Sequence, residues 1–187
     1  MVAIVFERLE GQIPGPVPHP TLDDETRDAW ISLGDEPGLF FESQMKSYWV
    51  EVDYGLRESA ALRRTSCSVA NSNIVDGVFI PHGMSGIADI ELHGYLTNEA
   101  IIDPKDLLWE WGNLGFRPAN YAELYAFGAE HPSAQLQAHI LAMGSWIGVG
   151  SNRRVPCLGH DGAARAAFLE YWNDVKKGQV FLLTRVQ

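Results

Sequence analysis

Residues 153–172, RRVPCLGHDGAARAAFLEYW, decide the fold class of this chain of 187 residues. Aliphatic and aromatic side chains gather on either side of the turn signal GHDG at residues 159–162. Short β-favouring runs separated by glycine-containing turns are typical of antiparallel strands. Further runs of the same kind precede and follow this stretch, so the C-terminal part is predicted to be an antiparallel meander. Its predicted strands are 139–149, 153–158, 166–172 and 180–186.

Two helix starts are visible upstream of the meander. Asp103 and Pro104, followed by Asp106, supply an N-cap, a proline at the first helical position and an acid in the first turn. Asn120 and Glu123 have the spacing of a capping box. The other predicted elements are a strand at 2–9, a proline-rich connector at 12–20, a helix opening at Thr21, strand content in 39–52, an ambiguous segment at 59–69, and a hairpin of strands 74–80 and 87–96.

These elements do not alternate strictly as strand, helix, strand, so the pattern favours an α+β fold over an α/β fold. We expect an antiparallel sheet packed with two to four short helices. A length of 187 residues suits one globular domain, residues 1–187.

The charge balance argues against nucleic-acid binding. The chain carries 24 acidic and 14 basic residues, for a net charge of −10, and its basic residues form pairs at most. Phosphate contacts need clustered Lys and Arg. An acidic surface fits good solubility or, alternatively, mimicry of a nucleic acid towards a basic partner.

Membrane insertion and secretion are not expected either. No run of 18 apolar residues exists, and the apolar opening of the chain lacks a basic n-region. Two cysteines, Cys67 and Cys157, cannot form a disulfide framework, so reduced thiols and a cytoplasmic location are predicted. The glycine spacings fit neither phosphate-binding fingerprint, so no cofactor is expected.

The order of motifs in residues 120–187 resembles a group of small uncharacterised bacterial proteins carried as mobile gene cassettes. It rests on YAELYAFGAEHP at 121–132, ILAMGS at 140–145, RVPCL at 154–158, the aromatic strand ending in Trp172 and FLLTRV at 181–186. The resemblance implies a bacterial, cytoplasmic accessory protein. It brings no catalytic residue with it.

The clearest polar group consists of Asp89, Glu91 and His93, which share one face if the segment is a strand. Two carboxylates and an imidazole offer a divalent metal three ligands, with His82 from the adjoining loop as a fourth. The same residues suit general acid–base catalysis. The alternative is an ordinary half-buried strand with its polar side in water.

Two other groups offer weaker candidates. Cys157, His160 and Asp161 contain a nucleophile, a base and an orienting acid, but they lie too close along one turn to face each other. A buried cysteine beside a solvated histidine is the alternative. His131 is interpreted as a helix-terminal residue and His139 as a strand residue.

Trp109 and Trp111 are two residues apart on a predicted helix and cannot point the same way, so one is expected at the surface. Exposed tryptophan marks interfaces.

Two functions remain open. The favoured one is a protein-binding or interaction module, inhibitor-like or immunity-like, that contacts a protein partner or forms a homodimer. The alternative is a small-molecule-binding domain or enzyme with its polar site around His82, Asp89, Glu91 and His93.

Overall fold

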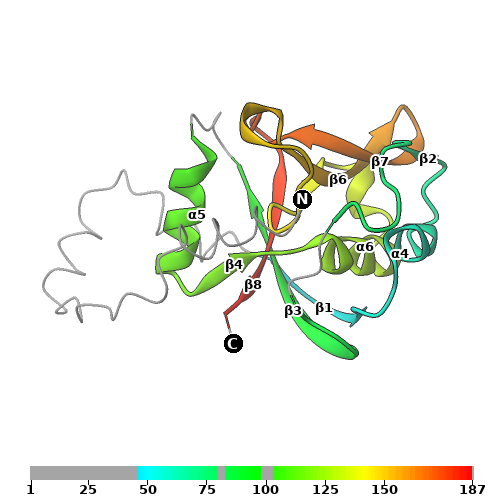
Figure 1. Ribbon diagram of the computed structural model, residues 1–187, viewed down its shortest axis with the longest axis horizontal. Coiled ribbons are helices and arrows are strands. Elements are labelled where there is room, and N and C mark those ends of the chain that lie inside the picture. The colour runs from blue at the N-terminus through cyan, green and yellow to red at the C-terminus, as the bar shows by residue number, and fades with distance from the viewer. Residues whose placement is uncertain (1–45, 80–82, 98–102, 187) are drawn as a thin grey trace, which may run out of the picture.

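The computed structural model describes residues 46–79, 83–97 and 103–186 (Figure 1). In chain order the described elements are β1 (Lys46–Asp53), α4 (Glu58–Arg64), β2 (Val69–Ala70), β3 (Ile87–Leu96), α5 (Pro104–Asn113), β4 (Phe116–Pro118), α6 (Tyr121–Glu130), the 3-10 helix η1 (Ala134–Leu136), β5 (Ile140–Leu141), the 3-10 helix η2 (Gly150–Asn152), β6 (Arg154–Asp161), β7 (Ala164–Tyr171) and β8 (Val180–Arg185). Outside the described residues lie the predicted strand at 2–9, the connector at 12–20, the helix opening at Thr21 and the loop residue His82.

The described strands form one mixed sheet in the order β1-β3-β8-β5-β6-β7-β2. β4 also pairs with β8, on the stretch of β8 that follows its pairing with β5. The β2–β7 and β5–β8 pairs are parallel, and the other described pairs are antiparallel. The α+β class is therefore confirmed, with a sheet that is mixed where a purely antiparallel one was predicted.

The C-terminal meander is correct in its centre and wrong at its ends. β6 and β7 form the predicted hairpin, but its turn is the shorter Gly162-Ala163 pair, where Gly162 has a φ of +60°. The predicted strand at 139–149 shrinks to the two residues of β5, because the chain then turns and Gly144 packs its backbone against Ala119. β8 leaves the meander and inserts between β3 and β5.

The predicted hairpin of strands 74–80 and 87–96 is also wrong. β3 pairs instead with β1, from Lys46 opposite Gly94 to Asp53 opposite Ile87. Residues 74–79 form turns, and the buried carboxylate of Glu58 binds them by accepting hydrogen bonds from the backbone N–H groups of Gly77 and Phe79.

Both predicted helix starts are confirmed. Asp103 accepts a hydrogen bond from the Lys105 backbone N–H at 2.9 Å at the start of α5. At the start of α6, the Asn120 side chain accepts from the Glu123 N–H, and the Glu123 carboxylate accepts from the Asn120 N–H at 2.8 Å. The ambiguous segment at 59–69 contains both of the predicted element types, because α4 is followed by β2.

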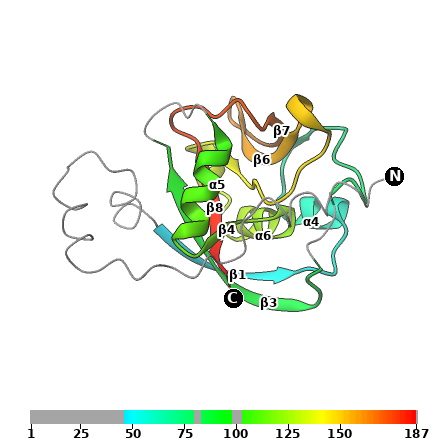
Figure 2. The ribbon, with the colours of Figure 1, turned by 60° about the vertical axis from the view of Figure 1, so that its left-hand side comes forward.

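Helices pack against the sheet over two clusters of buried side chains. The first cluster contains Leu124 and Phe127 of α6 with Val50, Leu92 and Leu182 of the sheet. The second joins α5 to β8 and β6, and its members include Leu107, Trp111, Val155, Phe181 and Leu183. α5 stands apart from the α4–α6 pair in Figure 1, and Figure 2 shows it beside β4. Consecutive residues of β8 thus enter opposite clusters, which explains why its sequence FLL is apolar without alternation.

Candidate functional site

The polar strand residues Asp89, Glu91 and His93 lie in β3 on the face opposite Ile90 and Leu92, as their spacing predicts. Asp89 is exposed, Glu91 is half-buried and His93 is buried. His93 Nε2 lies 3.7 Å from Glu91 Oε2, too far for a hydrogen bond. Within the described part of the chain, the donor atoms of Asp89, Glu91 and His93 do not lie close enough together to bind one ion. These three side chains therefore do not converge on one ion-binding point within the described residues, and His82, the fourth predicted ligand, lies outside them.

The surroundings of His93 favour its neutral form. Its ring packs edge-on against Phe116, with 5.0 Å between ring centroids. Burial lowers the pKa of His93 below its usual 6.5, with Arg185 acting in the same direction and Glu91 against it. A neutral imidazole can accept a proton, but catalysis would also need a cavity for a substrate beside it. A cavity of about 350 Å³ lies elsewhere, and its lining residues are Tyr54, Gly55, Leu56, Arg57, Glu58, Asp76, Gly77, Phe79 and Tyr121.

The depressed pKa of His93 predicts a loss of stability in acid. Both states carry a neutral imidazole above pH 6.5, whereas below it the unfolded chain binds a proton that the folded chain resists. The free energy of unfolding should therefore fall as pH decreases from 6.5 towards the folded pKa, by at most about 1.4 kcal/mol per pH unit for this one group. Urea denaturation of the wild type and of His93→Gln measures this change in the free energy of unfolding. The pH range runs from about 7.5 to about 5.5, roughly one unit on either side of 6.5.

The variant should show the shallower pH dependence. Glu110 has a pKa raised by burial and opposes this trend, but it is present in both proteins and cancels in their difference. Equal pH dependence in the two proteins would show that His93 ionises as freely in the folded state as in the unfolded one.

The two tryptophans of α5 differ in exposure, as expected. Trp109 is 63% exposed, while Trp111 is fully buried between Tyr95 and Phe181. Burial removes Trp111 from the surface, so of these two tryptophans only Trp109 can contact a partner.

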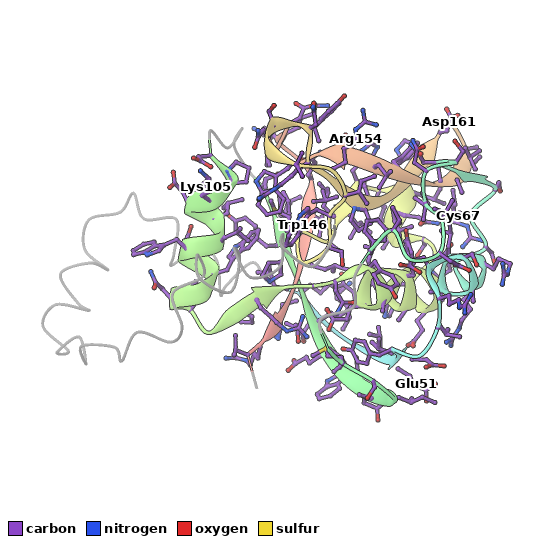
Figure 3. The ribbon with its side chains drawn as sticks, in the orientation of Figure 1. Glu51, Cys67, Lys105, Trp146, Arg154 and Asp161 are labelled. Carbon is purple, nitrogen blue, oxygen red and sulfur yellow. The ribbon has the colours of Figure 1, made fainter. Side chains whose placement is uncertain are left out.

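A second exposed tryptophan lies on the outer face of β1 and β3, among acidic residues. Trp49 is 65% exposed and sits opposite Glu91, and Glu51 sits opposite Asp89. These four residues are here named the acidic strip. Figure 3 shows Glu51 at the end of the sheet away from β7. The sequence pattern revealed only the β3 half of this strip, because the pairing of β1 with β3 was not predicted.

The structure places Cys157 beside residues other than the predicted His160 and Asp161. His160 Nδ1 lies 3.0 Å from the carbonyl oxygen of Gly162, and Cys157 gathers instead with His139 and Glu170. Their donor atoms lie within 4.8 Å of one another, with His139 Nδ1 3.3 Å from Glu170 Oε1. Burial, with Glu170 adding to it, raises the pKa of Cys157 well above its usual range.

Sequence reasoning missed this group because it depends on the register of three strands. One signal was present: if the tight turn had been placed at Gly162, alternation would have put Cys157 and Glu170 on the same face of the hairpin. Nothing in the sequence indicated that β5 would bring His139 beside them.

No helix among the described residues combines the length and apolar character needed to span a membrane. Comparison of the chain with family models, curated proteins and solved structures gave no match.

Proposed function

We propose that the protein is a protein-binding module that uses the acidic strip to bind a basic segment of a partner protein. The observation that carries this proposal is the pairing of Glu51 directly opposite Asp89, next to the exposed Trp49. The expected role is that of an accessory protein, inhibitor-like or immunity-like, acting in the cytoplasm.

The facing carboxylates are unfavourable in the free protein. Like charges directly opposite each other on neighbouring strands destabilise a sheet. Glu91 adds a third carboxylate beside them, in a chain whose net charge is −10. Lys or Arg side chains from a partner would relieve this repulsion, and the long-range field would speed their encounter.

Trp49 supplies the apolar contact that charge alone lacks. Its indole stands on the same face as the carboxylates and offers both a large apolar surface and an N–H donor. Tryptophan surrounded by a polar rim is a common centre of binding energy at protein interfaces.

The test measures binding of the full chain to a set of extended peptides that differ in Lys and Arg content. We expect affinity to rise with positive charge and to fall with salt, because surface charges are screened. Trp49→Ala should weaken binding by about 2 kcal/mol, roughly 30-fold, as expected for a central interface tryptophan. Trp109→Ala is the matched control and should leave affinity unchanged.

Asp89→Asn sharpens the test because its two effects have opposite signs. Removing one of two facing charges should raise the free energy of unfolding by about 0.2–1 kcal/mol while weakening peptide binding. Equal affinity for neutral and basic peptides, or equal losses from the two tryptophan variants, would refute binding at the acidic strip.

A further inference from the structure

We propose that His139, Cys157 and Glu170 together bind one Zn²⁺ ion, with a water molecule in the fourth position. The three side chains come from neighbouring segments of the sheet. Cys157 lies in β6, Glu170 lies in β7, and His139 immediately precedes β5. β5 pairs with β6, and β6 pairs with β7, so the backbone of the sheet fixes how the three donors approach.

Strand register puts the donors on one face. Cys157 is opposite Phe168 and Val155 is opposite Glu170, so alternation places the thiol and the carboxylate on the same side of the hairpin. Val155 and Cys157 belong to the core cluster that includes Trp111 of α5, and the partly buried Phe168 packs against it. The donor group therefore lies at the border of that cluster and not on a flexible loop.

The distances suit a small ion. Zinc bonds of about 2.0–2.1 Å to nitrogen or oxygen and about 2.3 Å to sulfur, in tetrahedral geometry, separate ligand atoms by roughly 3.3–3.6 Å. His139 Nδ1 and Glu170 Oε1 are already 3.3 Å apart. All three donor atoms lie within 4.8 Å, so side-chain movements of about 1 Å complete the geometry.

The histidine ring is held in place before any ion arrives. It stacks on Phe168 at 5.6 Å between centroids. It also lies against the bare backbone of Gly159, where an added Cβ would be only 2.7 Å from a ring carbon of His139. These contacts with an aromatic side chain and a glycine hold the ring with Nδ1 3.3 Å from Glu170 Oε1, and such preorganisation favours binding.

The donor set selects the type of ion. A thiolate with an imidazole suits Zn²⁺ and related transition metals, whereas Mg²⁺ and Ca²⁺ prefer oxygen ligands alone. Three protein ligands are the number found in zinc centres that keep a position for water. The Cys157 side is sealed, but the side chains of His139 and Glu170 are 36% and 20% exposed and give solvent access to that position.

The experiment titrates the full chain with ZnCl₂ by calorimetry and with CoCl₂ by absorption, using MgCl₂ as the comparison salt. We expect one Zn²⁺ per chain, a thiolate-to-cobalt charge-transfer band and no binding of Mg²⁺. Cys157→Ala should abolish the band, and His139→Gln and Glu170→Gln should each weaken Zn²⁺ binding more than about tenfold. Circular dichroism checks that each variant is folded. His139 and Glu170 are partly exposed, so their variants keep the test valid if Cys157→Ala does not fold.

Two matched controls locate the ion. Cys67→Ser removes the other thiol, and Glu91→Gln removes the carboxylate of the His93 pair. Both should leave Zn²⁺ affinity unchanged. Gly159→Ala removes no donor but displaces the His139 ring, so it should weaken binding while keeping the charge-transfer band. Absence of Zn²⁺ binding, a missing thiolate band in the wild type, or equal losses in the control variants would overturn the proposal.

Discussion

Replacing Trp111 with alanine is expected to lower the free energy of unfolding by about 3–5 kcal/mol, the range for removing a large buried aromatic side chain. Trp111 is fully buried and belongs to the cluster through which α5 packs on the sheet. Its ring lies 5.4 Å from Phe181 and 5.8 Å from Tyr95, measured between centroids. Urea denaturation followed by circular dichroism measures the loss.

Trp109→Ala is the control from the same helix. Its side chain is exposed, so its removal should change the free energy of unfolding by no more than about 0.5 kcal/mol. Similar losses for the two variants would mean that α5 does not present Trp111 to the core as described.

Replacing Glu123 with alanine is expected to cost about 3 kcal/mol, because it leaves a largely buried guanidinium without its partner. Glu123 is fully buried and accepts hydrogen bonds from Arg117 Nη2 and from the Tyr54 hydroxyl, both at 2.7 Å. Burial alone would lower the pKa of Arg117, but the hydrogen bond and charge of Glu123 raise it. Because the Arg117 side chain keeps some exposure, we place the loss at the lower end of the range of about 3–5 kcal/mol for a broken buried pair.

Glu130→Ala, at the other end of α6, is the matched control. Glu130 is exposed and accepts one hydrogen bond from the Glu51 N–H at 3.0 Å, so its loss should cost about 1 kcal/mol or less. A cycle with Arg117→Met measures the coupling of the pair, because Glu123→Ala should cost less once the guanidinium is absent. A coupling energy near zero would contradict the structural role given to this pair.

The parts of the fold that sequence predicted well are governed by neighbours in the chain. The starts of α5 and α6 follow from caps that act within three residues, at Asp103 and Asn120. The β6–β7 hairpin follows from two β-favouring runs around one turn. The position of β8 could not be read in this way, because its partners in β3 and β5 are chosen by packing on both faces at once.

The same distinction between local and long-range determinants applies to the candidate sites. Alternation within one strand correctly placed Glu91 and His93 together on β3. The partners of these residues on β1, and the gathering of His139 with Cys157, depend on register between strands distant in sequence. A shift of one residue in such a register moves every side chain to the opposite face, so local pattern cannot specify it.

The central place of β8 has a consequence for how the chain folds. The β1–β3 pair and the β5–β6–β7 group meet in the sheet through β8, which is the last described strand to be synthesised. Chains emerge from the ribosome N-terminal end first, and contacts between distant segments are slow to form. Until β8 arrives, the facing edges of β3 and β5 are open to pairing with other nascent chains. We therefore expect slow folding and dependence on chaperones during synthesis. Once the sheet is complete, β8 covers both edges.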